Sequence, residues 1–494
     1  MAPPVLPEEL LIRICSYLCF HCQNPNDFIN TDVPSVWENK ATLARVCLAS
    51  KRMLGIAQPI LYHYYATGNI PGPVYSLRVA DHGYPCADDK LPAFLCTLIR
   101  CPILATYVRS LQLQEVYSPR VPAIGFSTEL LHLFTNTSET LGIKPPIWAQ
   151  SAIDGYLPPP PYKGQTGPRI YIEFWLRELI IALTPRTEKI IYGHSRYAHL
   201  VRIKPSKRLL PALKSLAFRS GKTTYKLDGM LELIRMAPNL TSLYVIGSHS
   251  WNGEGLPERP SALPQLQKLV VEGLEVPGLN SLLRWQGQLR DLEYYSSGVI
   301  YGEAFVLALS PVKDVLTRLC YGSIFGNAHV DVPDDRCAEH WIRMQGIYST
   351  MASLKEFSRL RELIVDQAAL YYRHEHGYNF ATQRLVRLLP VSIESVHLTY
   401  VFTGIYGELL QLALAKPNKF PRLRHVKIGI VDRCQPDRQA GLEQMRTVEA
   451  DFAAVGVQME WSVDRCHADS NTVIPGGTVS AASIPLPTAP RRPR

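Results

Sequence analysis

Short strings of the form L-x-x-L-x-Φ, in which Φ is any apolar residue, recur along the second half of the chain. Eight of them begin, in order, at Leu213, Leu240, Leu266, Leu289, Leu316, Leu360, Ile393 and Leu423. The starting points lie 27, 26, 23, 27, 44, 33 and 30 residues apart, and Val108 begins an earlier, degenerate member. Several strings follow a turn that contains proline. Because alternate residues of a strand share one side, each string predicts a short strand whose leucines face a core.

Such a core has to be shared between neighbouring units. One strand with its return segment cannot cover its own apolar face, so stacked units must bury it together. Burial of about three large aliphatic side chains per unit contributes on the order of 5–8 kcal/mol before chain entropy is subtracted. Helical patterns at 228–236 and 278–285 lie between strings. The spacing is typical of a leucine-rich repeat, although a set of unrelated strands in another α/β fold stays open.

We therefore predict an α/β fold. Its main part is an irregular leucine-rich-repeat solenoid over residues 188–465, with short parallel strands on the concave side and helices and loops on the convex side. A helix at 442–453 and a strand at 457–461 would cap it. Residues 66–187 form a linking or N-terminal repeat region with a proline-rich loop near 143–169 and a buried helix at 169–183, which would form the first recognisable repeat together with a strand at 188–192. Residues 322–353 resemble an insertion, and residues 466–494 have the composition of a disordered tail.

Three helical patterns fill residues 1–65. The first, at 6–18, places Leu10, Ile14 and Leu18 on one stripe, with Pro7 at a favourable first position. A polar stretch at 22–40 predicts a loop, and helices at 42–51 and 51–65 follow, the last with Ser50 as its N-cap. So small a bundle carries more apolar side chains than its own core can absorb, which indicates a face that binds a partner. Alternatively, these helices cap the next domain.

This region resembles the F-box over roughly residues 5–65. The matching segments are Leu6-Pro7-Glu8-Glu9-Leu10 with Ile14 and Leu18, then Leu43-Ala44-Arg45-Val46-Cys47, then Lys51-Arg52. The resemblance implies docking onto the Skp-type adaptor of a Skp–cullin–F-box ubiquitin ligase. It places Leu6, Pro7, Leu10, Ile14, Leu18, Leu43, Val46 and Met53 at that interface. Two departures are the long loop at 22–40 and Met53, which stands where many members carry Trp or Phe. The leucine-rich array resembles the degenerate repeats that follow the F-box in many fungal proteins.

The predicted strands also indicate where a protein substrate would bind. The residue between the last two apolar positions of a string, and the one just after the string, face the concave side. They include Arg219, Tyr244, Glu272, Glu293, Tyr295, Asp366, His397 and Lys427. The set is mixed in charge and contains two tyrosines, a residue enriched at protein interfaces. These positions are equally the ordinary exposed residues of a strand.

Composition narrows the choice of function. A net charge of +9 over 494 residues is mild and not gathered into a stripe, so we expect no nucleic-acid partner. We expect no membrane span, because no uncharged apolar stretch reaches about 18 residues. Eleven cysteines without a disulfide framework are typical of an intracellular protein, cytoplasmic or nuclear. Cys19-x-x-Cys22, beside Cys15 and His21, has a zinc-like spacing but lacks a second ligand pair in the sequence, so no metal is expected.

No sequence motif of a catalytic or cofactor site is present, so we expect no enzyme activity and no cofactor. The leading hypothesis is the substrate-recognition subunit of a Skp–cullin–F-box ligase. The alternative is a leucine-rich-repeat scaffold or interaction protein without ligase activity.

Overall fold

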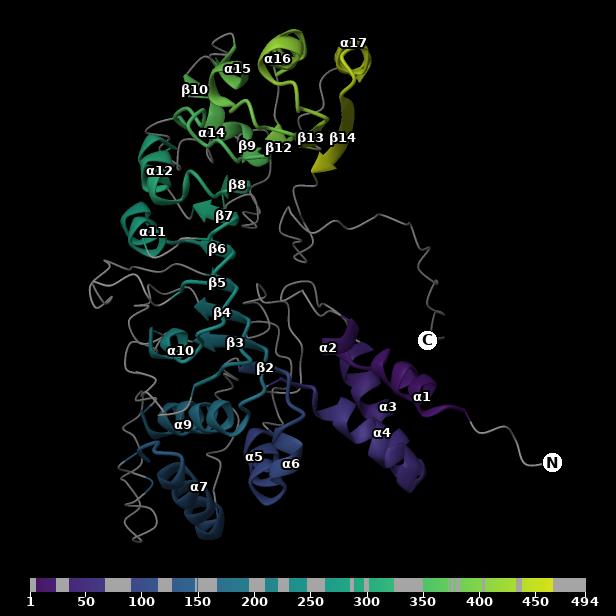
Figure 1. Cartoon of the computed structure of the whole chain (residues 1–494), viewed down its shortest axis with the longest axis vertical. Coiled ribbons are helices and arrows are strands. Elements are labelled where there is room, and N and C mark those ends of the chain that lie inside the picture. Colours follow the sequence, from purple (N-terminus) through teal and green to yellow (C-terminus); the bar gives the residue numbers. More distant parts are fainter. Residues whose placement is uncertain are drawn as a thin grey trace, which may run out of the picture.

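The computed structural model describes residues 6–23, 35–66, 90–113, 127–146, 149, 167–194, 209–220, 231–246, 263–284, 288–296, 302–323, 350–371, 373–374, 377–378, 383–401, 405–431 and 438–464. Most of the expected proline-rich loop, most of the expected insertion and all of the expected tail lie outside these residues. Figure 1 shows a long curved sheet with helices along its outer face and a separate group of helices beside its N-terminal end.

The described strands form a twelve-stranded parallel sheet whose strand order follows the chain. The strands are β1 (Tyr64–Ala66), β2 (Ser110–Leu113), β3 (Lys189–His194), β4 (Ser215–Ser220), β5 (Ser242–Ile246), β6 (Lys268–Glu272), β7 (Asp291–Ser296), β8 (Arg318–Ser323), β9 (Glu362–Asp366), β12 (Ser395–Val401), β13 (His425–Val431) and β14 (Gln458–Asp464). A two-residue hairpin, β10 (Arg373–His374) and β11 (Gly377–Tyr378), stands apart. Each of the eight strings runs into one strand of the sheet, so the prediction of strands there is confirmed.

The helices between strands pack against the outer face (Figure 1). They are α5 (Leu91–Arg100), α6 (Pro102–Ala105), α7 (Thr128–Thr140), α9 (Gly167–Leu183), α10 (Leu231–Arg235), α11 (Val276–Leu283), α12 (Gly302–Ala308), the 3-10 turn η6 (Ser310–Val312), α14 (Gln367–Leu370), α15 (Arg384–Leu388), α16 (Tyr406–Lys419) and α17 (Arg438–Ala454). The expected helices at 169–183, 228–236, 278–285 and 442–453 correspond to α9, α10, α11 and α17. The sequence patterns did not predict α7, α12 or α16.

One apolar core lies between the sheet and these helices. The second leucine of successive strings pairs in register across the strands, as Leu292 does with Leu319 and Leu319 with Leu363, and all three are fully buried. The last apolar residue of each string points the same way, so that the rings of Tyr294 and Tyr321 stack with centroids 5.7 Å apart. Each strand therefore adds one layer to a continuous core, as the strings predict.

Close packing at α12 requires a glycine. A Cβ atom on Gly302 would lie 2.4 Å from the backbone nitrogen of Met351. No side chain fits at that separation, so the start of α12 can approach the chain near Met351 only because Gly302 has none.

The N-terminal helices form a compact module. Its helices are α1 (Glu8–Ser16), α2 (Phe20–Gln23), α3 (Ser35–Ala49) and α4 (Lys51–Tyr62). Ser50 caps α4 as expected, with its hydroxyl accepting a hydrogen bond from the backbone N–H of Met53 at 3.1 Å. The prediction of a loop over 22–40 was wrong at both ends, because residues 22–23 belong to α2 and residues 35–40 to α3. The middle of that stretch, 24–34, lies outside the described residues.

The module joins the sheet without a linker. The third predicted helix ends at Tyr62 rather than near residue 65, because residues 64–66 pair with β2 and become the first strand. Only His63 separates α4 from β1. The sheet is equally continuous at residue 188, where we expected the solenoid to begin, since β2 pairs with β3. No helix in the described part of the chain combines the length and apolar character needed to cross a bilayer.

Candidate functional site

The residues expected on the concave side share the inner face of the sheet, opposite the main core. Tyr244, Glu293, His397 and Lys427 belong to one row that crosses the strands in register. Arg219, Glu272, Tyr295 and Asp366 each follow that row by two residues in their own strands. The alternation of each string therefore sorted these residues onto the correct face.

Their exposure differs from the expectation. Tyr244, Glu293, Tyr295 and Asp366 are buried, with 5–6% of their surface exposed. They lie within or beside a second apolar cluster on the inner face: Ile191, Ala217, Tyr244, Ile246, Val270, Tyr295, Cys320 and Ile364. The expectation of ordinary exposed strand residues was thus wrong for these four. Adjacent strands lie about 4.8 Å apart, so large side chains on a concave face contact one another and cover one another's surface from solvent.

The remaining four expected residues differ among themselves. Glu272, His397 and Lys427 are half-buried, and the side chain of Arg219 lies outside the described set. Lys427 pairs with Glu460 on β14 at 3.3 Å. Burial, followed by the charge of Lys427, lowers the pKa of His397 to about 4, so its ring is neutral at physiological pH. The more accessible part of the inner face therefore lies toward β12–β14.

A band of ion pairs crosses the inner face at β6, β7 and β8. Arg318 Nη1 donates to Asp291 Oδ1 at 2.7 Å and to Glu293 Oε1 at 2.8 Å, and Lys268 Nζ reaches Glu293 Oε1 at 2.9 Å. Arg318 Nε also lies 3.4 Å from a carboxylate oxygen of Glu362. Of these residues only Glu293 was expected at the site, because the others lie two residues before that row in their strands, outside the positions that the strings single out.

Glu293 is the buried centre of this band. Burial by itself disfavours the charged carboxylate, but Lys268 and Arg318 together hold the pKa of Glu293 below its usual value. The hydroxyl of Tyr295 donates to its second oxygen at 3.3 Å. Farther along the face, Thr399 donates a hydrogen bond to the buried carboxylate of Asp366. The polar groups of this band are paired with one another, which indicates a rigid surface that holds its shape.

The helical module presents an apolar outer face. Leu6, Leu10, Ile14 and Tyr17 follow one stripe of α1 and are about half exposed, between 46% and 61%. We call these four residues the outer patch. Arg52 donates from its guanidinium to the backbone oxygen of Leu6 at 2.7 Å. That contact places the start of α1 beside the turn between α3 and α4, where Leu48 is 87% exposed.

The residues expected at the adaptor interface divide into two groups. Leu6, Pro7, Leu10 and Ile14 are exposed, as an interface requires. Leu43 is 2% exposed and belongs to the core of the module, with Cys15, Ile56 and Ile60, so its placement at a surface was wrong. Leu18, Val46 and Met53 are half-buried and pack against that core. The exposed Tyr17, Leu48 and Leu54 were missed, although each lies within a helix that the sequence predicts.

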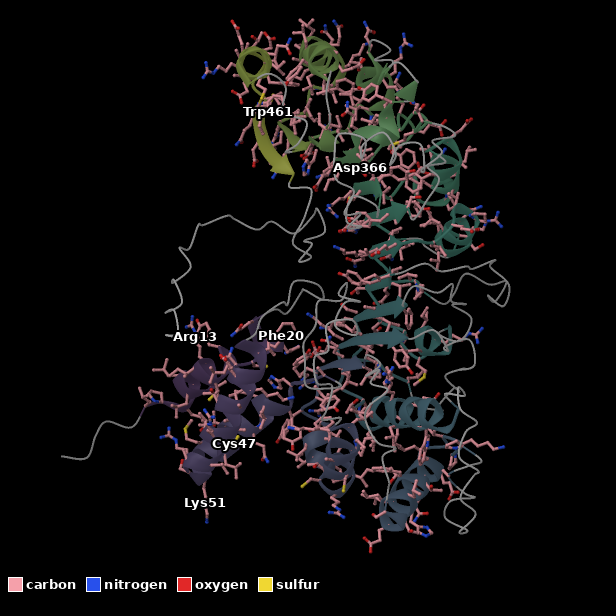
Figure 2. All side chains as sticks on the ribbon, turned by 180° about the vertical axis from the view of Figure 1, so that it is seen from behind. Arg13, Phe20, Cys47, Lys51, Asp366 and Trp461 are labelled. Atoms are coloured by element: carbon pink, nitrogen blue, oxygen red, sulfur yellow. The ribbon has the colours of Figure 1, made fainter. Side chains whose placement is uncertain are left out.

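The two ends of the module lie at different distances from the sheet. In Figure 2, Phe20 lies at the end of the module nearest the sheet, whereas Arg13 and Lys51 lie farther away. The ring of Phe20 packs against that of Tyr64 in β1, with centroids 4.7 Å apart. The part of α1 around Arg13 therefore lies away from the sheet, while α2 contacts it.

Four potential metal ligands meet at that contact. Cys19, His21, Cys22 and His63 each bring one ligand atom, and these atoms all lie within 4.8 Å of one another. His63 Nδ1 lies 3.4 Å from the sulfur of Cys22 and 3.9 Å from that of Cys19. The sequence offered no second ligand pair for Cys19 and Cys22, and the fold supplies one in His21 and His63. A histidine 41 residues beyond Cys22, at the end of a predicted helix, gives no local signal of this role.

No protein-family model matches the chain, and no curated protein matches its sequence. The function is therefore inferred from the outer patch, the inner face and the way that the module meets the sheet.

Proposed function

We propose that the protein is the substrate-recognition subunit of a Skp–cullin–F-box ubiquitin ligase. The module would be an F-box that binds a Skp-type adaptor, and the sheet with its helices would be a leucine-rich-repeat solenoid that binds a protein substrate. The observation that carries this proposal is the outer patch on α1. A small helical module with a complete core of its own still exposes a stripe of large apolar side chains.

The energetics of the outer patch favour a protein partner. Complete burial of a Leu or Ile side chain contributes roughly 1.5–3 kcal/mol, so Leu10 and Ile14, each about half exposed, would add appreciably to binding. Contiguous exposed apolar residues with a polar surround mark interaction sites on soluble proteins.

The curved sheet supports the second half of the proposal. Its strand order follows the chain, its leucines stack in register and its helices cover one face, which are the features of a repeat array. The half-buried Glu272, His397 and Lys427 and the salt-bridged band give the inner face a mixed polar surface suited to a folded or extended protein. The chain would perform no chemistry and would raise the local concentration of substrate near the transfer enzyme.

Co-purification tests the adaptor half. The full chain would be co-expressed with a Skp-type adaptor, as wild type and as the variant Leu10→Asp with Ile14→Asp. A matched control is Leu410→Asp with Leu414→Asp, which charges two exposed leucines of α16. We expect the adaptor to elute with the wild type and the α16 control and to be lost from the α1 variant. A wild-type chain that elutes alone would overturn the proposal.

The alternative is a leucine-rich-repeat interaction protein without ligase activity. One observation favours it: Leu43 is buried inside the module, and Val46 and Met53 pack on its core, so fewer side chains than expected remain for an adaptor. A wild-type chain that captures no adaptor, yet retains a partner that a charge reversal at Lys427 releases, would support this alternative.

A further inference from the structure

We propose that Cys19, His21, Cys22 and His63 bind one zinc ion at the junction between the helical module and the sheet. Cys19 precedes α2, His21 and Cys22 belong to it, and His63 lies between α4 and β1. The ion would join two segments that are separated by about 40 residues of chain. The proposal does not depend on the proposed function, because it concerns the isolated chain.

The geometry is close to that of a tetrahedral site. With Zn–S bonds of about 2.3 Å and Zn–N bonds of about 2.0–2.1 Å, a sulfur and a nitrogen on one ion stand about 3.5 Å apart. The sulfur of Cys22 lies 3.4 Å from His63 Nδ1, and that of Cys19 lies 3.9 Å from the same atom. All four ligand atoms fall within 4.8 Å of one another, so small side-chain rotations suffice to close the site.

The donor set is suited to zinc in charge and in softness. Two thiolates neutralise a divalent ion, so the partly buried site would carry no net charge when filled. Sulfur and imidazole ligands in tetrahedral arrangement favour zinc over the oxygen-seeking Mg²⁺ and Ca²⁺. Four protein ligands leave no open position, which is the pattern of a structural site.

The surroundings prepare these ligands for a cation. His21 Nδ1 is buried and has no hydrogen-bond partner among the described residues. A buried polar atom without a partner is costly, and such atoms in native structures often mark an ion or water.

The proposed site lies where the module meets the first two strands of the sheet. The backbone oxygen of His63 accepts hydrogen bonds from the N–H groups of Arg109 and Ser110, at 2.9 and 2.8 Å, which lead into β2. On the other side, Lys40 of α3 donates from Nζ to the backbone oxygen of Tyr64 at 3.1 Å. An ion held by α2 and His63 would therefore fix the module against the first two strands.

The test is the metal content of the full chain, purified without chelator from cells supplied with zinc. We expect about one zinc per chain for the wild type and a nearly complete loss in Cys22→Ser and His63→Ala. The matched controls are Cys101→Ser and His132→Ala, which change an exposed cysteine and an exposed histidine outside the cluster and should keep the zinc. A wild-type chain without zinc that also fails to take it up in a titration would overturn the proposal.

A second measurement covers variants that fail to fold. Replacement of zinc by Co²⁺ in the wild-type chain should give the visible absorption of a tetrahedral site, together with bands from two thiolate ligands. The alternative is a disulfide between Cys19 and Cys22, which thiol titration of the freshly purified chain detects. Such a disulfide in a chain that carries no metal would overturn the proposal. Removal of zinc by chelator should increase hydrogen exchange in α2 and β1 but leave β6–β8 unchanged, because the site contacts only the first strands.

Discussion

The helical module and the sheet differ in how far their large apolar side chains are buried. Along the sheet, one core runs from Tyr65 in β1 to β14, and a second apolar cluster lies on the inner face. The module has a core of six buried residues, and seven of the thirteen large apolar side chains that are exposed in the described chain lie between Leu6 and Leu54. Large apolar residues of the sheet thus mainly form its cores, whereas many of those in the module lie at its surface. The same residue type therefore stabilises the fold in one region and is available to a partner in the other.

The largest effect should come from a leucine inside the sheet. Leu319 is fully buried between Leu292 and Leu363, so Leu319→Ala should lower the free energy of unfolding by about 2–5 kcal/mol through lost burial and a cavity. Leu10→Ala on the outer patch should change it by less than about 0.5 kcal/mol. Urea unfolding measures both. Equal losses would mean that α1 packs as a core element and that the contrast between the two regions fails.

The ion-pair band should give the next largest effect. Arg318→Met leaves the buried Glu293 with Lys268 as its one cationic partner in the described chain, and we expect a loss on the order of 2–4 kcal/mol in the free energy of unfolding. The control is Lys313→Met, which removes the surface pair of Lys313 with Glu356 and should leave the urea midpoint almost unchanged, because exposed ion pairs add little to stability. If the two variants unfold at the same urea concentration, the burial of Glu293 does not make its ion pairs stronger than an exposed pair.

The same band gives a pH dependence of known sign. The pKa of Glu293 is lowered on folding, so its contribution is present above the unfolded value of about 4.3 and is lost as the pH falls through the lower, folded value. Urea unfolding of the wild type should therefore become easier below about pH 4.3. Arg318→Met should lose less than the wild type over the same pH range, because part of the stabilisation is already missing.

The smallest effect concerns the module. Ser50→Ala removes the hydrogen bond that caps α4 and should cost about 1 kcal/mol. Because the module has few buried side chains of its own, the change should appear as faster hydrogen exchange in α4 and leave the strands β5–β9 unaffected. Exchange that rises across the whole chain would show that module and sheet unfold as one unit.

Strand positions could be predicted from sequence because their signal is local. Each L-x-x-L-x-Φ string contains both the alternation that makes a strand and the leucines that bury it, so β4–β9, β12 and β13 follow from the sequence. The short helix α2 could not be found, because four residues give no period, and α12 has only seven residues. Helix α7 was missed although Ser127 caps it and Leu130, Leu131 and Phe134 recur at helical spacing.

The site depends on contacts that no local pattern contains. Whether Tyr244 or Glu293 is exposed is decided by neighbouring strands and by the curvature of the sheet. Leu43 and Leu10 have the same side chain and both lie on helices, yet Leu43 is buried against α4 and Leu10 is 46% exposed. His63 joins Cys19 and Cys22 only because β1 forms beside α2, which is a property of the fold.

The order of the strands bears on how the chain acquires its structure. Every strand of the large sheet pairs with its nearest neighbours along the chain, from β1 to β14, and none closes back on a distant one. From β4 to β8 the paired residues are 23–27 apart in sequence, whereas β2 and β3 pair residues 79 apart. The shorter separations lower the entropic barrier to forming those contacts. The array could therefore form strand by strand during synthesis, with the N-terminal strands first. A destabilising substitution in one strand would weaken the neighbouring strands before the distant ones.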